Sequence, residues 1–294
     1  MKLNKIKLAL GLVAAAPMVA FAAADQEKAM GDANNWSHPR NGYDNHGYTA
    51  LSQVNKGNVK NLKAAWTFAT GVNRGHEGAP LVIGSTMYVH TAFPNNVYAL
   101  DLNNDQKIVW SYFPKQDPSV QAVLCCDNVN RGLGFGDGKI FLQQNDGQLV
   151  ALDAKTGKKV WEVQNTDPKV GATNTNAPHV YKDKVLSGCS GAEFGVRCFI
   201  AAYNIKDGSL AWKAYSTGPD KEVLIGADFN KENPLYSAMS VYEDVNGGNK
   251  QGGSFKKIDT AKLEGGVKDL GLKTWLKPQA VKDGWQHGGG SVWG

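Results

Sequence analysis

Two short segments in the first half of the sequence combine residue types that could bind a ligand. Cys125 and Cys126 are adjacent, and Glu77 stands between small residues in Arg74-Gly-His-Glu-Gly-Ala-Pro80. The cysteines could be two buried thiols, could be bonded elsewhere, or could form a strained eight-membered disulfide ring. Taken alone, the glutamate fits a solvated turn before the strand that follows better than it fits a binding site.

Two later segments carry the other candidate groups. Glu193 lies in the glycine- and serine-rich stretch 187–197, where the backbone could approach a ligand and a carboxylate could bind a hard cation. The triple glycine 288–290 precedes Trp293, whose ring offers a flat face, although a glycine-rich loop with a core Trp fits equally well. Cys189 and Cys198 could cross-link one hairpin or stay free.

The elements that must position these groups come from a repeat. Segments 99–110, 151–161 and 202–212 each read Ala, then Asp or Asn two residues on, a polar turn, and a terminal Trp. Their Trp residues are spaced 51 and 51 residues apart, and Trp66 resembles the end of an earlier, degenerate unit. A fixed period of this size is typical of a repeat architecture.

Each unit is expected to contain antiparallel strands. Asn145-Asp-Gly147 and Thr156-Gly157 supply turn residues that tolerate positive φ between apolar runs. No segment after the leader shows helical periodicity over eleven residues. The sequence therefore predicts an all-β protein, a β-propeller in which each Trp packs against the next blade.

Chain length limits how much of a propeller is present. About 51 residues per blade would build about five blades from roughly 270 residues. The pattern stops after Trp212, and 218–290 is polar and rich in Gly and Lys. An unclosed propeller exposes strand edges, so we expect this chain to be the N-terminal part of a longer protein.

The first 24 residues are predicted to be an export signal. Lysines 2, 5 and 7 precede an apolar stretch shorter than the roughly 20 residues that span a bilayer, and small residues mark cleavage near Ala22 or Ala24. Without these three of the 32 basic residues, 29 remain against 27 acidic ones. The mature chain is therefore expected to be exported and soluble, and nearly neutral, which gives no support to nucleic-acid binding.

The sequence resembles the quinoprotein alcohol dehydrogenase family, and within it the large subunits of methanol dehydrogenases that depend on pyrroloquinoline quinone (PQQ). The resemblance runs from Trp36 to Gly294 and rests on RGHEGAPLV, FPNNVYALDL, CCDNVNRG, SGAEFGVR and GGGSVWG in that order. It implies an eight-bladed propeller of which residues 25–294 form about the first half.

The resemblance also assigns roles to individual residues. It implies that Cys125 and Cys126 form a disulfide ring against one face of PQQ and that Trp293 stacks on the other face. The polar PQQ-binding residues that it implies are Glu77, Arg131, Thr175, Ser190, Gly191, Ala192 and Ser291. Ser291 stands where the family usually has Thr, and Cys198 where it more often has Gly.

A metal completes the chemistry that the resemblance implies. Glu193 is similar to the family's metal ligand, with Ala192 favouring calcium over a lanthanide. The family's Asp base and a further Asn ligand would lie beyond Gly294, so this chain alone is expected to be inactive. The implied reaction is oxidation of methanol or a similar primary alcohol in the periplasm, with cytochrome c as acceptor. The resemblance further implies a small second subunit as a partner, and homodimerisation of the large subunit.

Two other functions compete with this one. An exported propeller with the same repeats could be a non-catalytic scaffold, but a scaffold needs neither the adjacent cysteines nor the segments around Glu77 and Glu193. A related quinoprotein for longer alcohols differs in residues that partly lie outside this sequence.

Overall fold

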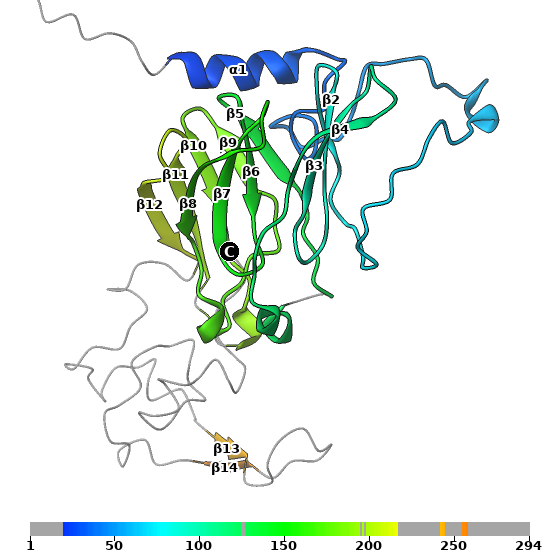
Figure 1. The fold of residues 1–294 in the computed structure, drawn as a ribbon. Coiled ribbons are helices and arrows are strands. Elements are labelled where there is room, and N and C mark those ends of the chain that lie inside the picture. Colours follow the sequence, from blue (N-terminus) through cyan, green and yellow to red (C-terminus); the bar gives the residue numbers. More distant parts are fainter. Residues whose placement is uncertain are drawn as a thin grey trace, which may run out of the picture.

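The computed structural model describes residues 20–124, 127–194, 196, 198–216, 242–244 and 255–257. Its main body consists of three four-stranded antiparallel sheets that follow one another along the chain (Figure 1). Each sheet is a meander in which neighbouring strands in sequence are neighbours in space. These sheets are three successive blades of a β-propeller, as predicted.

The strand bounds show how regular the units are. The first blade contains β1 (Leu81–Ile83), β2 (Thr86–His90), β3 (Val97–Asp101) and β4 (Lys107–Tyr112). The second contains β5 (Leu133–Gly136), β6 (Lys139–Gln143), β7 (Gln148–Asp153) and β8 (Lys159–Gln164). The third contains β9 (His179–Tyr181), β10 (Lys184–Ser187), β11 (Phe199–Asn204) and β12 (Leu210–Tyr215). A separate hairpin pairs β13 (Tyr242–Asp244) with β14 (Phe255–Lys257).

The sequence repeat corresponds to one structural register. The repeated Ala pairs with the repeated Trp in all three blades: Ala99 with Trp110, Ala151 with Trp161, and Ala202 with Trp212. The register shifts directly after that Ala in each blade. The extra residue of the first unit therefore lies in the turn and leaves the pairing unchanged.

The repeated Trp residues join one blade to the next. Trp110 Nε1 donates a hydrogen bond to Ala154 O at 3.0 Å, and Trp161 Nε1 donates to Ile205 O at 3.1 Å. Each acceptor belongs to the following blade, which confirms that the Trp residues are structural. Trp212 is 46% exposed, and no further four-stranded sheet follows it among the described residues.

The middle blade is buried on both faces. One apolar cluster joins the first two blades through residues such as Val97, Leu142 and Val150, and a second joins the next two through Phe141 and Val185. Since successive side chains point to opposite faces of a strand, both faces need apolar residues. This explains the nearly continuous apolar runs of β6 and β7.

One α-helix differs from the expectation of no helical segment. α1 (Ala20–Gly31) lies across one end of the sheets (Figure 1). Its sequence, AFAAADQEKAMG, is rich in the good helix formers Ala, Gln, Glu, Lys and Met, which favour a helix without an apolar stripe. Ala29 is buried in the core, and the Asp25 carboxylate accepts a hydrogen bond from Gly138 N at 3.1 Å. Among the described residues, no helix is long and apolar enough to cross a membrane.

Short 3-10 turns lie in the segment before β1 and in three connections between strands. They are η1 (Val59–Asn61), η2 (Pro118–Val123), η3 (Pro168–Val170) and η4 (Ala192–Phe194). Trp66, predicted to end an earlier unit, is 39% exposed and lies outside any strand. A four-stranded sheet that it could join is absent from the described residues before β1, which explains the difference.

Candidate functional site

Four of the residues assigned to cofactor binding come from segments far apart in sequence. Glu77 precedes β1, Arg131 precedes β5, and Thr175 precedes β9, so each stands before the first strand of a different blade. Ser190 lies in the loop between β10 and β11. The meander brings these segments to the same end of the sheets, which is the end away from α1 (Figure 1).

Arg131 connects the first blade to the third. Its Nε lies 3.1 Å from Glu77 Oε2, and its Nη1 donates to Thr175 Oγ1 at 3.1 Å and to Thr175 O at 3.3 Å. The backbone N of Arg131 donates to the same carbonyl at 3.1 Å. Because a guanidinium has a rigid fork of donors, one side chain serves both neighbours at once.

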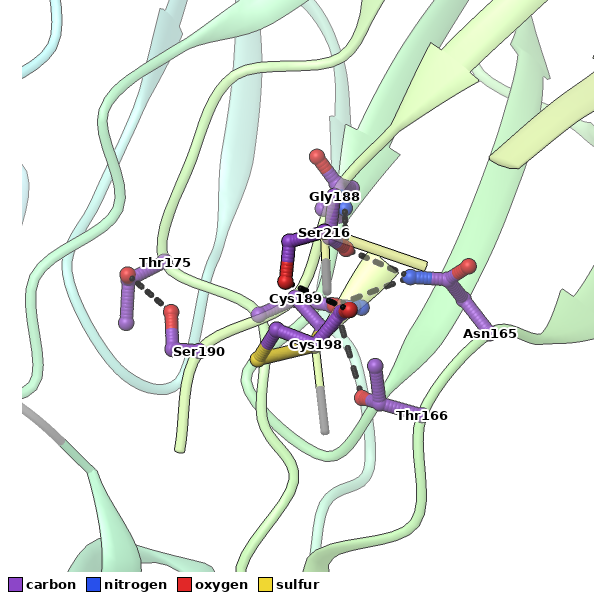
Figure 2. The surroundings of a disulfide bond; sticks show 10 residues. Asn165, Thr166, Thr175, Gly188, Cys189, Ser190, Cys198 and Ser216 are labelled. Atoms are coloured by element: carbon purple, nitrogen blue, oxygen red, sulfur yellow. Dashed lines mark hydrogen bonds between the residues drawn. A yellow bond between two sulfur atoms is a disulfide. The ribbon is translucent and has the colours of Figure 1, made fainter. Parts of the chain in front are cut away.

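Thr175 extends this chain of contacts to Ser190. The two hydroxyl oxygens are 2.8 Å apart, and both residues are buried (Figure 2). Two backbone hydrogen bonds between Thr173 and Ser190, at 2.8 and 3.0 Å, fix the loop against the segment before β9. Glu77, Arg131, Thr175 and Ser190 therefore form one continuous series of polar contacts across three blades, which we call the polar relay.

His90 and Asn130 support the relay, and the sequence analysis missed both. His90 Nε2 donates to Asn130 O at 3.1 Å, next to Arg131, and a Cβ on Gly78, next to Glu77, would overlap the His90 ring. Burial lowers the pKa of His90 to about 4, so the imidazole is neutral at pH 7. Nothing in the sequence distinguishes a supporting histidine in a strand from any other histidine.

Gly191 needs to be glycine for two reasons. Its φ is +125°, a region that side chains rarely adopt, and a Cβ there would overlap Gly171 O. Its carbonyl accepts hydrogen bonds from Phe194 N at 2.9 Å and Val196 N at 3.1 Å. Gly191 and Ala192 are both buried, so they shape the loop that follows Ser190.

The structure settles the state of the second cysteine pair. Cys189 and Cys198 form a disulfide whose Cα atoms are 5.5 Å apart, at the base of the loop that carries Ser190 (Figure 2). Of the two alternatives left open by the sequence, the cross-link between the strands of one hairpin is therefore the correct one. Cys189 and Cys198 are 3% and 0% exposed.

The remaining predicted site residues cannot be placed. Cys125, Cys126, Ser291 and Trp293 lie outside the described residues. The backbone of Glu193 lies in η4, but its side chain is not among those described. In the described part of the chain, no group of three or more His, Cys, Asp or Glu residues could hold a metal ion.

Part of the relay is open to a ligand. The Arg131 and Glu77 side chains are 37% and 46% exposed, so a ligand can reach them, whereas Thr175 and Ser190 are buried beside them. A guanidinium with neighbouring hydroxyls matches the geometry and charge of carboxylates. This donor set therefore fits the carboxylates of an anionic cofactor such as PQQ.

The comparisons with known proteins agree with this chemistry. Residues 36–236, more than half of the chain, match the family described as "PQQ: Glucose/ethanol/alcohol dehydrogenase, beta-propeller domain". Methanol dehydrogenase [cytochrome c] subunit 1 of Methylorubrum extorquens is 47% identical over 89% of this chain and 37% of its own length. A lanthanide-dependent methanol dehydrogenase of the same organism is 49% identical over 86% of this chain and 36% of its own length.

A solved structure shows the same relationship in three dimensions. A europium-containing methanol dehydrogenase matches with a TM-score of 0.65 and 49% identity, over 74% of this chain and 39% of that chain. This chain thus spans little more than a third of the length of these relatives. The family match, the two relatives and the solved structure all lead to one assignment: the chain belongs to the β-propeller family of PQQ-dependent glucose, ethanol and alcohol dehydrogenases.

Proposed function

We propose that the complete protein is a PQQ-dependent dehydrogenase that oxidises methanol or a similar primary alcohol to the aldehyde and passes the electrons to cytochrome c. The polar relay carries this proposal, because it brings the Arg131 guanidinium of the second blade and two hydroxyl groups of the third blade into one series of contacts. Since this chain spans little more than a third of its relatives, we propose that residues 25–294 supply the first part of an eight-bladed propeller.

The residues of this chain would bind and orient the cofactor. Arg131 would donate hydrogen bonds to its carboxylates, and so would one of the Thr175 and Ser190 hydroxyls, because the other hydroxyl proton is used in the bond between the two. Glu77 would also contact the cofactor and holds the guanidinium in place. Cys125-Cys126 and Trp293 would cover its two faces, and Gly191, Ala192 and Ser291 would complete its polar surroundings. PQQ supplies a quinone that accepts hydride from an alcohol, and a metal ion beside it acts as a Lewis acid.

Glu193 is the proposed metal ligand. A carboxylate is the charged ligand that hard cations prefer, and its position directly after Ala192 places it next to the relay along the chain. We propose calcium, while two of the relatives named above are described as lanthanide-dependent and europium-containing. A catalytic Asp and a further Asn ligand are proposed to lie in the part of the protein that follows Gly294.

Export and partners complete the proposal. Residues 1–24 would be the signal peptide that directs the protein to the periplasm, an oxidising compartment in which the Cys189–Cys198 disulfide would persist. A small second subunit and a second copy of the large subunit are the proposed protein partners.

The test begins with the protein that the gene encodes. Sequencing past codon 294 should reveal further Trp-docking repeats, an Asn and an Asp in one open reading frame. The purified protein, loaded with PQQ and calcium or a lanthanide, should oxidise methanol and reduce cytochrome c. A protein that retains no PQQ after loading would contradict the proposal and favour the scaffold function, and a strong preference for longer alcohols would contradict methanol as substrate.

A further inference from the structure

The Cys189–Cys198 disulfide closes a loop that contains much of the proposed cofactor site. The eight residues between the cysteines include Ser190, Gly191, Ala192 and Glu193, which the proposed function assigns to PQQ and the metal. Of these, Ser190 follows Cys189 directly and touches Thr175 through its hydroxyl at 2.8 Å. The bond thus lies one residue from the relay.

The strand pairing between β10 and β11 does not extend to the ends of this loop. The last pair between β10 and β11 is Ser187 with Ala201, and β11 begins at Phe199. The loop therefore leaves the sheet before Cys189 and re-enters it after Cys198. The disulfide links its two ends at a Cα–Cα distance of 5.5 Å, beyond the last paired residues.

Both ends of the loop are fixed to the core. Gly188 O accepts a hydrogen bond from Asn165 Nδ2 at 2.8 Å, and Cys198 O accepts from Ser216 N and Ser216 Oγ, both at 3.0 Å (Figure 2). The two cysteines belong to the apolar cluster shared by the second and third blades. The two ends of the loop therefore cannot separate without breaking a covalent bond inside a packed core.

We infer that the Cys189–Cys198 disulfide is a positioning element for the cofactor-binding loop, and this inference rests on the proposed function. By closing a short loop, it reduces the number of conformations that the loop samples before a ligand binds. Binding then loses less conformational entropy, and the Ser190 hydroxyl and the backbone of η4 stay in register with Thr175 and Arg131. We therefore expect the disulfide to slow the release of the cofactor and the metal, in addition to any effect on overall stability.

The test is a double variant of the complete, PQQ- and calcium-loaded enzyme. Cys189→Ala with Cys198→Ala removes the bond without burying a new polar group. Without the bond the loop samples conformations that do not contact the cofactor, so PQQ should be released about tenfold faster. Release of PQQ into buffer and metal content are measured directly, together with separate kcat and KM values.

Trp161→Phe is the matched control. It removes the hydrogen bond to Ile205 O, so it weakens the joint between the same two blades without touching the loop. Its Tm should fall, but its PQQ release should stay at the wild-type rate. If the control accelerates release as much as the double variant does, the disulfide acts only through overall stability and the inference is overturned.

A second variant protects the test against a failure to fold. Cys189→Ala with Cys198→Gly introduces, at the completely buried Cys198, the residue that the family more often has there. Hydrogen exchange in either variant should rise in residues 190–196 and remain unchanged in β9–β12. A variant that folds but keeps wild-type exchange and wild-type release overturns the inference alone, whereas a wild-type protein that retains no PQQ overturns the proposed function as well.

Discussion

The Trp110 ring lies against Gly157 so closely that a Cβ added to this glycine would be 2.5 Å from the indole. The same indole donates its N–H to Ala154 O at 3.0 Å. Trp161 and Gly208 repeat the arrangement one blade later, where an added Cβ would be 2.7 Å from the ring. The glycine six residues after the repeated Ala is therefore a docking surface for the Trp of the preceding blade, and it also provides the left-handed turn.

Gly157→Ala should reveal how much this docking contributes. The substitution combines a strained φ of +69° with displacement of Trp110, so the free energy of unfolding should fall by about 2–4 kcal/mol. Gly84→Ala is the matched control, because Gly84 has a φ of +58° and nothing within 4 Å of an added Cβ. It should cost only about 1–2 kcal/mol of backbone strain. Denaturant unfolding measures both, and equal losses would contradict a docking role.

Arg131→Lys should separate charge from geometry in the relay. Lysine keeps the positive charge but has no planar fork, so it cannot contact Glu77 and Thr175 at once. We expect PQQ affinity to fall by about tenfold, which corresponds to roughly 1.4 kcal/mol, and Tm to change little. Titration of the apoprotein with PQQ provides the measurement.

Arg74→Lys is the control for this change. Arg74 is 52% exposed, its guanidinium lies 3.9 Å from Asp127, and it is not part of the relay. An equal loss of PQQ affinity in both variants would show that the loss does not depend on the contacts of Arg131 with Glu77 and Thr175, and would contradict the role of the relay.

His90 should make stability depend on pH. Its pKa is lowered to about 4 in the folded state because it is buried, while an unfolded histidine titrates near 6.5. The unfolded chain therefore binds more protons between these values, so stability is fully present above pH 6.5 and is lost as the pH falls toward 4. The slope from this residue approaches about 1.4 kcal/mol per pH unit.

The measurement compares wild type with His90→Gln in urea at several pH values from 4.5 to 7. Glutamine can still donate to Asn130 O but does not titrate in this range. The variant should be less stable at pH 7 and show a shallower loss on acidification. Parallel curves would contradict a buried neutral His90.

The blades were predictable from the sequence because the same pattern of residues occurs three times and has the same structural environment each time. The docking of Trp110 and Trp161 on the next blade followed from the spacing of 51 residues, whereas the pairing of the repeated Ala with the repeated Trp became visible only in the structure. The residues of the relay could be predicted as site residues only through the resemblance to a known family. Nothing local links Glu77 to Arg131, since the contact depends on how two blades are stacked.

Other features depend on tertiary context and escaped prediction. A spacing of nine residues between Cys189 and Cys198 fits both a disulfide and two thiols, and only the closeness of the β10 and β11 ends decides between them. The helix α1 has no apolar periodicity, because only a few of its side chains, such as Ala29, enter the core. The support of Asn130 by His90 leaves no sequence signal, since it joins two segments 40 residues apart.

Adjacent Cys125 and Cys126 are predicted to be bonded to each other. Bonds that exchange with Cys189 or Cys198 are excluded by the disulfide between that pair. Mass spectrometry of unreduced peptides should show a mass two hydrogens lower for the peptide that contains both residues. Free thiols at these positions would contradict the proposed ring beneath the cofactor.

Glu193→Ala should abolish metal-dependent activity of the complete protein. A carboxylate contributes charge as well as oxygen ligands, so Glu193→Gln should also lose the metal, and Glu193→Asp should retain part of it. Metal bound after dialysis, measured by mass spectrometry, gives the result independently of turnover.

Glu162→Ala is the matched control, because Glu162 lies on β8 in an exposed ion pair with Lys159 and is not part of the site. Because η4 is held by hydrogen bonds to Gly191 O, loss of the Glu193 carboxylate should leave the loop and its disulfide in place. A Glu193→Ala protein with full metal content and activity would contradict the ligand assignment.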